Sequence, residues 1–285
     1  MKLQHQVPLG PLTTWRIGGA ADNYIAPTKW DDLATFLQSM PQNTDPIYWL
    51  GLGSNVLVPD EGLRGLVIHT KKLASTITGI KTVRAEAGVT CAKLARYCVK
   101  HGLSGATFFA GIPGTVGGAL AMNAGAFGGE TWRQVVAVEV INRQGERYLR
   151  QPEEYRIGYR SVTCPKQDEW FLAGHFAFSP GDPVQLGQAL RGLIQQRNQS
   201  QPIGTFSCGS VFTNPPGDYA ARLIEHCGLK GYKIGAIQVS EKHANFMVNC
   251  GGATAQDTLA LMNHIKQTVQ EKTGILLTSE VRVLA

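Results

Sequence analysis

The sequence has no apolar run of about 18 residues, the length that a membrane-spanning helix needs. Its first residues, Met1-Lys2-Leu3-Gln4-His5-Gln6, also lack the apolar core of a signal peptide. The two absences together predict a cytoplasmic protein that makes no membrane contact.

Several motifs of catalysis, metal binding and nucleotide binding are missing too. The six cysteines form no CxxC pair, so they read as reduced thiols and indicate neither a zinc site nor a disulfide framework. No HExxH segment supports a metal site, and no GxSxG elbow supports a hydrolase. Since there is no GxxxxGK[ST] segment and no third glycine three residues after Gly53, a nucleotide would have to be bound by another kind of loop.

Positive charge is in moderate excess but is not concentrated. Lys and Arg number 27 against 21 Asp and Glu, a net charge of +6, and no basic run is longer than Lys71-Lys72. This spread is typical of a solvated surface and argues against nucleic acid as a partner. Some of the cations are expected to converge on an anionic small ligand.

The length of 285 residues suits two or three hydrophobic cores rather than one, and 43% apolar with 17% charged residues is an ordinary globular composition. Helix caps and apolar spacing predict helices over Thr28–Met40, Thr90–His101, Asp182–Arg197, Asp218–Cys227 and Thr254–Gly274. Strand-like stretches, the last over Leu276–Leu284, lie among the helices without a βαβ rhythm, which predicts an α+β fold. Boundaries are expected near residue 70 and near residue 200, where Asn198–Pro202 has linker composition.

Two glycine clusters stand out among the 33 glycines. Gly51-Leu52-Gly53-Ser54-Asn55 lies between two apolar runs and predicts a strand, a loop and a second strand. The loop amides would suit phosphate oxygens, but a simple tight turn explains the segment equally well.

The second cluster, from Gly111 to Gly129, is harder to attribute to packing because so many glycines weaken any regular element. Backbone contact with a large flat ligand would account for it. The alternative is close packing of a helix against a sheet through Gly117 and Gly118.

Ser210 follows Cys208-Gly209 and precedes Val211-Phe212, where a loop enters a strand. By its local motif it is a nucleophile, a general acid or, most simply, a turn residue. Arg160, Glu280 and His243 have no distinctive setting when each is taken alone, and surface exposure or a structural role is the default.

In their order along the chain, these segments resemble the UDP-N-acetylenolpyruvoylglucosamine reductase family, flavoenzymes of bacterial cell-wall precursor synthesis. The resemblance covers nearly the whole chain, and the length of the chain is similar to that of the shorter form of the family. The motifs that carry it are Thr14–Gly19, Gly51–Leu57, Gly111–Gly118, Asn123–Ala126, Tyr159-Arg160, Ser207–Asn214, Gly228–Gly235, Val239–Phe246 and Glu280–Arg282.

The resemblance implies an architecture and two redox partners. Residues 1–70 and 71–199 would be two α+β subdomains of an FAD-binding unit of the vanillyl-alcohol-oxidase-like type, and residues 200–285 an α+β substrate domain whose last strand returns Glu280 to the active site. NADPH would reduce the FAD and leave, and the enolpyruvyl UDP-sugar would then use the same cleft. No protein partner, nucleic acid or membrane is implied.

The resemblance also implies catalytic roles. Hydride transfer to the vinyl carbon creates negative charge that Arg160 and Glu280 would stabilise at the substrate carboxylate. Glu280 would then need a raised pKa, because a carboxyl group helps there when it is protonated or hydrogen-bonded. Ser210 would be the general acid that protonates the adjacent carbon.

Binding roles are carried over in the same way. The first glycine cluster would lie over the FAD pyrophosphate and the second along the flavin. The cofactor-binding residues would be Gly51, Leu52, Gly53, Ser54, Asn55, Val56, Leu57, Gly111, Ile112, Pro113, Gly114, Val116, Gly117, Gly118, Asn123, Gly125 and Ala126. The substrate-binding residues would be Tyr159, Arg197, Asn214, Lys230 and Arg282.

The chain departs from the family pattern where Thr213 and Ser200 replace frequent basic residues, so fewer cations would face the diphosphate. It also departs after Tyr159-Arg160, where Ser161-Val162 replaces the usual residue-then-serine order. Two other functions are weighed against the reductase. One is a flavin-dependent oxidase or dehydrogenase of a small hydroxylated substrate on a related fold. The other is a non-catalytic binder of UDP-sugars or nucleic acid, which has no evident need for the three polar residues.

Overall fold

The computed structural model describes residues 2–41, 45–73 and 76–285, and the chain divides into two compact units. The first consists of Met1–Leu3, Ile25–Gly51 and Val67–Arg197, and the second of Gln4–Tyr24, Leu52–Leu66 and Asn198–Ala285. Both are discontinuous in sequence. The division at residues 70 and 200 therefore stays a prediction.

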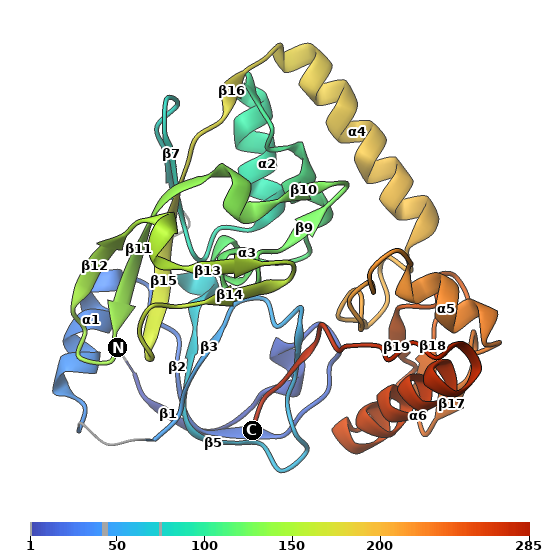
Figure 1. Cartoon of the computed structure of the whole chain (residues 1–285). Helices are drawn as coiled ribbons and strands as arrows, with labels where there is room; N and C mark the ends of the chain where they lie inside the picture. Colours follow the sequence, from blue (N-terminus) through green and yellow to red (C-terminus); the bar gives the residue numbers. More distant parts are fainter. Residues whose placement is uncertain (1, 42–44, 74–75) are drawn as a thin grey trace. The chain divides into compact units, whose positions relative to one another are not determined.

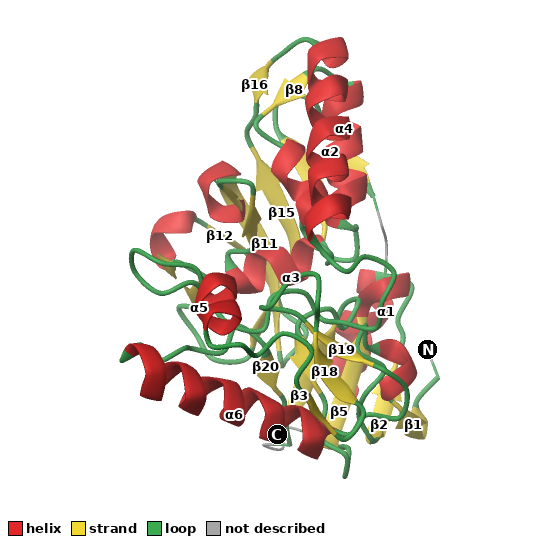
Figure 2. Cartoon of the chain, turned by 90° about the vertical axis from the view of Figure 1, so that its right-hand side faces the viewer, coloured by secondary structure: helices red, strands yellow, loops and turns green. Residues whose placement is uncertain are grey.

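The first unit is built on an antiparallel sheet of order β12-β11-β15-β7-β6. Figure 2 shows β11, β12 and β15 side by side. The strands of this sheet are β6 (Ile77–Thr78), β7 (Val83–Glu86), β11 (Val135–Asn142), β12 (Arg147–Arg150) and β15 (Glu169–Phe176). The shorter strands of the unit are β3 (Ile47–Leu50), β8 (Leu103–Ser104), β9 (Gly125–Ala126), β10 (Gly129–Glu130), β13 (Arg156–Gly158), β14 (Ser161–Thr163) and β16 (Ser179–Pro180).

Its helices are α1 (Trp30–Ser39), α2 (Cys91–Lys100), α3 (Val116–Met122) and α4 (Pro183–Ser200). One hydrophobic core contains Leu94 of α2, Leu120 of α3 and Leu190 of α4 together with residues of the sheet. The 3₁₀ turns of this unit are η2 (Thr70–Lys72), η3 (Thr107–Gly111), η4 (Thr131–Gln134) and η5 (Pro152–Glu154).

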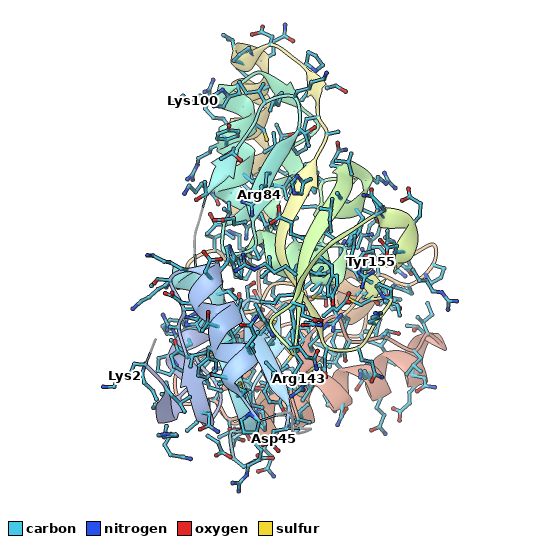
Figure 3. All side chains as sticks on the ribbon, turned by 90° about the vertical axis from the view of Figure 1, so that its left-hand side faces the viewer. Lys2, Asp45, Arg84, Lys100, Arg143 and Tyr155 are labelled. Atoms are coloured by element: carbon cyan, nitrogen blue, oxygen red, sulfur yellow. The ribbon has the colours of Figure 1, made fainter. Side chains whose placement is uncertain are left out.

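A charged cluster crosses three strands of this sheet. Arg84 of β7, labelled in Figure 3, donates from Nε and Nη2 to the two carboxylate oxygens of Glu139 of β11, at 2.6 and 2.7 Å. His175 of β15 contacts the same carboxylate at 2.7 Å. These hydrogen bonds, that of Arg84 above all, lower the pKa of Glu139. The same cross-strand pairs stabilise the pairing of the three strands.

The second unit has its own core, which includes Trp15, Phe212 and Ile265. Helix α6 packs on the antiparallel sheet β17-β18-β19, as Figure 1 shows. Its elements are β1 (Gln4–Pro8), η1 (Gly10–Leu12), β2 (Ala20–Ile25, with Ile25 in the first unit), β4 (Val56–Leu57), β5 (Leu63–His69, ending in the first unit), α5 (Ala220–His226), β17 (Lys233–Ile234), β18 (Ile237–Val239), β19 (Met247–Asn249), α6 (Ala255–Thr273) and β20 (Arg282–Val283).

The α+β prediction is confirmed, and the expected helices are present. Thr90 caps α2 by accepting from the Lys93 amide, and Thr254 caps α6 by accepting from the Asp257 amide. Gly274 ends α6 with a left-handed φ of 74°.

The two units divide between Arg197 and Asn198, at the segment expected to be a linker. The chain there is helical, because α4 continues through Ser200 and stops shortly before Pro202. One local expectation is wrong. The predicted strand over Leu276–Leu284 is reduced to β20, which pairs in parallel with β4. Most of that segment instead makes single bridges and isolated backbone bonds.

Candidate active site

The second glycine cluster surrounds the start of α3 in the first unit. The amides of Val116 and Gly117 donate to the carbonyls of Val89 and Ala87, at 2.8 and 3.0 Å. A Cβ on Gly117 would lie 2.8 Å from that of Ala87, so packing requires glycine there. Gly118 is exposed, and a Cβ on it would meet only the Thr115 hydroxyl, at 3.8 Å. The packing explanation thus holds for Gly117 and leaves Gly118 unexplained.

Glycines also bring separate segments of this unit together. A Cβ on Gly111 would lie 2.6 Å from that of Ala126, and a Cβ on Gly51 would lie 2.7 Å from the Thr115 hydroxyl. Gly51 is the residue of the first glycine cluster that belongs to this unit. It therefore lies against Thr115, at the start of α3. Ile112, Pro113 and Gly114 form the loop between η3 and α3.

Asn123 ends α3 in the left-handed conformation, with φ at 45°. Its carboxamide donates to the Gly158 carbonyl at 3.0 Å and accepts from the Trp132 amide at 3.1 Å. The side chain therefore connects α3 to the β13–β14 hairpin. Contact of Asn123 with the cofactor stays a prediction.

Arg160 occupies the turn between β13 and β14 with a left-handed φ of 52°. Its guanidinium donates from Nη2 to the Gly125 carbonyl at 2.8 Å and from Nη1 to the Asn123 carbonyl at 3.4 Å. The same group lies 5.0 Å from the centre of the Tyr159 ring. The structure thus brings four predicted site residues together: Asn123, Gly125, Tyr159 and Arg160.

Arg197 reaches the second glycine cluster from α4. Its Nη1 atom donates to the carbonyl of Ala110, the residue before Gly111, at 3.3 Å. Burial lowers the pKa of this guanidinium from its usual value, which still leaves it cationic at neutral pH. A predicted substrate cation therefore lies beside a predicted cofactor segment.

In the second unit, Gly53 turns the first glycine loop with φ at 61°. Its carbonyl accepts from the amide and the hydroxyl of Thr14, at 3.0 and 3.3 Å. A Cβ there would lie 2.7 Å from the Leu12 carbonyl oxygen and from the Thr13 Cα. The loop is thus fastened to the segment that opens the Thr14–Gly19 motif.

The continuation of that loop meets the C-terminal segment. The Asn55 carboxamide donates to the Glu280 carbonyl at 3.0 Å, and the Arg282 amide donates to the Asn55 carbonyl at 3.1 Å. Val56 and Leu57 form β4, which pairs with Arg282 and Val283 of β20. Asn55 therefore fixes the backbone that carries Glu280.

Glu280 and Ser210 lie on adjoining extended segments of this unit. The Glu280 amide donates to the carbonyl of Val211 at 2.8 Å, while Ser210 forms an antiparallel bridge with Phe246. The half-buried Ser210 hydroxyl makes no hydrogen bond with any residue that the structure describes. It is therefore available to a ligand.

Cys208, two residues before Ser210, is a buried thiol. Burial raises its pKa well above the usual value, and the nearby charge of Glu280 raises it further. A thiol with so raised a pKa is a poor nucleophile, so Cys208 is a packing residue.

Two predicted substrate residues have structural partners in the second unit. Asn214 accepts from the Ala220 amide at the start of α5, at 3.1 Å. The Lys230 ammonium pairs with the Glu225 carboxylate at 2.7 Å. Contact with a substrate would have to share or replace these bonds.

Comparison with known proteins decides the family. Residues 201–284 match a family model described as the C-terminal domain of UDP-N-acetylenolpyruvoylglucosamine reductase, and residues 21–148 match an FAD binding domain. A UDP-N-acetylenolpyruvoylglucosamine reductase of Alkalilimnicola ehrlichii is 51% identical over 99% of this chain and 95% of its own length. One of Coxiella burnetii is 50% identical over 97% of this chain and 94% of its own length.

The chain belongs to the UDP-N-acetylenolpyruvoylglucosamine reductase family. The fold agrees, since the crystal structure of the reductase (MurB) from Thermus caldophilus superposes with a TM-score of 0.86 at 33% identity, covering 100% of both chains. The resemblance inferred from the sequence motifs is confirmed. The matches favour a reductase over the oxidase and binder alternatives.

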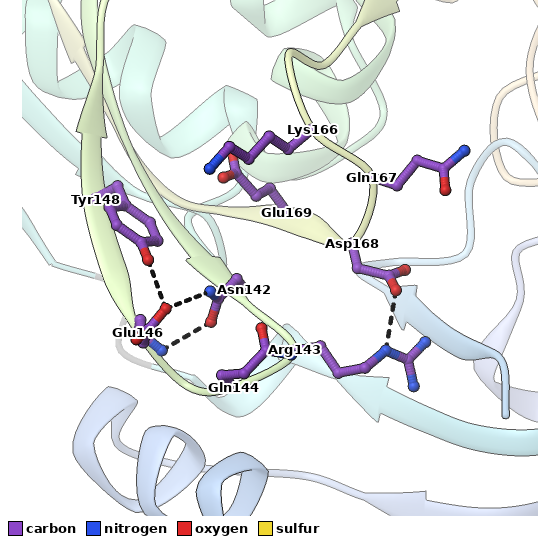
Figure 4. Close-up of a pocket in the computed structure, with 9 residues that line it drawn as sticks. All are labelled: Asn142, Arg143, Gln144, Glu146, Tyr148, Lys166, Gln167, Asp168 and Glu169. Carbon is purple, nitrogen blue, oxygen red and sulfur yellow. Dashed lines mark hydrogen bonds and ion pairs between the residues drawn. The ribbon is translucent and has the colours of Figure 1, made fainter. Parts of the chain in front are cut away.

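A polar hollow of about 300 Å³ lies in the first unit (Figure 4). Its charges are largely matched within the hollow or just outside it. Arg143 pairs with Asp168 at 2.9 Å, and Arg150 pairs with Glu169 at 2.6 Å. The residues that line it are Asn142, Arg143, Gln144, Glu146, Tyr148, Lys166, Gln167, Asp168 and Glu169. None of them is a predicted site residue.

Within residues 2–41, 45–73 and 76–285, no group of His, Cys, Asp and Glu is arranged to hold a metal ion. Among the helices in the same ranges, none has the length and apolar character to span a membrane. Asn245 is a buried residue within the family motif Val239–Phe246, and no sequence motif predicted a role for it. The signal that points to Asn245 is a buried amide side chain in an apolar setting, because such a group nearly always has hydrogen-bond partners.

Proposed function

We propose that this chain reduces the enolpyruvyl group of UDP-N-acetylglucosamine enolpyruvate to UDP-N-acetylmuramate, with NADPH as reductant and FAD as cofactor, in peptidoglycan precursor synthesis. The observation that carries the proposal is the juxtaposition of Ser210 and Glu280 through the 2.8 Å bond from the Glu280 amide to Val211. It occurs in a chain whose full-length relatives carry the reductase name.

The residues present fit FAD. Gly118 is exposed in the first turn of α3, and no neighbouring atom in the described chain requires glycine there. Close approach of a cofactor to this backbone would account for it. Gly51–Leu57, Gly111–Gly118 and Asn123–Ala126 would hold the FAD, and all three segments lie within the FAD binding domain match over residues 21–148, which supports the assignment.

Bound FAD supplies the hydride, which it takes from NADPH. When a hydride adds to the terminal vinyl carbon, negative charge develops on the adjacent carbon and spreads into the carboxylate. Arg160 would bind that carboxylate and stabilise the charge, and Glu280 would assist as a protonated carboxyl group that donates a hydrogen bond to it. Ser210 would donate its hydroxyl proton to the adjacent carbon, which completes the addition of one hydride and one proton.

The UDP moiety would be bound by Tyr159, Arg197, Asn214, Lys230 and Arg282. Residues 1–70 and 71–199 would form the FAD-binding subdomains and residues 200–285 the substrate domain, a division supported by the C-terminal domain match over residues 201–284. The reaction would take place in the cytoplasm.

The test separates the two half-reactions. FAD-loaded protein is reduced by NADPH without oxygen and then mixed with the enolpyruvyl UDP-sugar. We expect the flavin colour to disappear in the first step and return in the second. Protein that takes up no FAD, or reduced protein that the sugar nucleotide does not reoxidise, would refute the proposal.

A further inference from the structure

The side chain of Asn245 makes two hydrogen bonds to the backbone that follows Ser210. Its Oδ1 atom accepts from the Phe212 amide at 3.0 Å, and its Nδ2 atom donates to the Phe212 carbonyl at 2.8 Å. The Asn245 carbonyl also accepts from the Val211 amide at 2.9 Å. One residue therefore satisfies three polar groups of this backbone, the Val211 amide and both the amide and the carbonyl of Phe212.

The side-chain hydrogen bonds of Asn245 take the place of a regular strand ladder. Ser210 and Phe212 make only isolated bridges, to Phe246 and Ser279 respectively. Phe212 is 1% exposed and Asn245 is 4% exposed, so water cannot readily substitute for the lost partners. The position of this short segment depends on the amide of Asn245.

Asn245 is itself held in place. Its backbone amide donates to Nδ1 of His243 at 3.3 Å, and the Ser240 hydroxyl accepts from the amides of Lys242 and His243, at 3.2 and 3.3 Å. On the other side of the segment, Val211 accepts from Glu280. The Ser210 backbone is thus tied to two supports, one of which carries the proposed carboxylate-binding residue.

We propose that Asn245 is a positioning residue that aims the Ser210 hydroxyl for proton donation. The proposal rests on the proposed reductase function. It assigns Asn245 to the second half-reaction, in which the substrate is protonated, and not to reduction of the flavin by NADPH. Small displacements of a reacting group are costly, and a shift of about 1 Å slows a reaction about 100-fold.

The experiment uses full-length, FAD-loaded protein with Asn245→Ala and a matched control. Asn249 is a buried asparagine of the same unit, 6% exposed. It donates to the Trp15 carbonyl at 2.9 Å and accepts from the amides of Gly251 and Ala253. Asn249→Ala therefore removes at least as many side-chain bonds without touching the segment of Ser210.

We expect Asn245→Ala to slow flavin reoxidation by the enolpyruvyl substrate about 100-fold, with the rate of reduction by NADPH within about twofold of the parent. A solvent deuterium isotope effect on reoxidation should grow, because proton transfer becomes limiting. Asn249→Ala should lower thermal stability yet leave both the rate and the isotope effect near parental values. Asn245→Asp, which preserves shape and the bond to the Phe212 amide, should give an intermediate rate and serves if the alanine variant does not fold.

Unchanged reoxidation in both Asn245 variants would overturn the proposal. Equal slowing by the Asn245 and Asn249 variants, with no larger isotope effect, would reduce Asn245 to a stabilising residue. Failure of the parent protein to reoxidise would instead refute the reductase function itself, so the two failures are distinguishable.

Discussion

Arg160 donates from Nη2 to the carbonyl oxygen of Gly125 at 2.8 Å, and this bond sets the guanidinium against the end of α3. The left-handed turn that carries Arg160 and the absent side chain at Gly125 are both needed for it. A Cβ on Gly125 would lie 3.0 Å from Nη1 of Arg160 and 2.3 Å from the Gly129 carbonyl.

Gly125→Ala should therefore displace Arg160. A lost hydrogen bond to a charged group costs about 1.5–3 kcal/mol, so we expect kcat/KM for the enolpyruvyl substrate to fall by about tenfold or more. Gly128→Ala is the control, since Gly128 lies in the same hairpin with φ at 81° and no atom near its Cβ position. It should cost stability and spare activity, and similar kinetics for the two variants would contradict the role given to Gly125.

Ser210→Ala should slow turnover by about two to four orders of magnitude and retain flavin reduction by NADPH. Removing a general acid slows a reaction by about 100- to 10,000-fold, and stopped-flow measurement of each half-reaction would show which one is affected. The buried Cys208 provides a neighbouring control, because Cys208→Ser keeps the local size and should leave reoxidation far less affected. A normal reoxidation rate in Ser210→Ala would exclude Ser210 as the proton donor.

Gly53→Ala should lower the stability of the second unit and weaken FAD binding. The left-handed conformation alone costs a non-glycine residue about 1–2 kcal/mol, and here the new Cβ also meets the backbone of Leu12 and Thr13. Gly252→Ala carries the conformational cost alone, since φ is 78° and no atom lies near. Urea unfolding and FAD titration of the two variants should show the larger loss for Gly53→Ala.

Acid should destabilise the loop that supports Ser210. Burial lowers the pKa of His243 from 6.5, so below that pH the unfolded chain binds a proton that the folded chain does not. The free energy of unfolding should then decline as pH falls from 6.5 toward the folded pKa. His243→Gln should flatten this decline in thermal unfolding measured at several pH values, and an unchanged slope would contradict the assignment.

Gly192→Ala should stabilise the protein. Gly192 lies in the interior of α4, is exposed and has no atom near its Cβ position. Replacing a helical glycine by alanine is worth about 0.5–1 kcal/mol. Chemical denaturation should show the gain without a change in either half-reaction, and a loss of stability would mean that α4 is not a regular helix there.

Local signals predicted the helices well because caps act over a few residues. Thr90, Thr254 and Gly274 satisfy or turn backbone groups within one helical turn, so their sequence positions mark where α2 and α6 begin or end. The C-terminal strand was overpredicted for the opposite reason. Its length depends on β4, more than two hundred residues earlier in the chain, which offers Val56 and Leu57 for pairing.

The sequence by itself determined the fold class, the family and the list of residues on which the proposed chemistry depends. Tertiary structure decided which of them contact one another. Asn55 bonds to the Glu280 carbonyl, Glu280 bonds to the segment of Ser210, and Arg160 bonds to the Gly125 carbonyl. It also separated Gly117, which packing requires, from Gly118, which packing leaves free, and it identified Asn245 as a backbone support. A motif specifies the donors and acceptors, whereas hydrogen bonds between distant segments depend on how the whole chain buries its polar backbone.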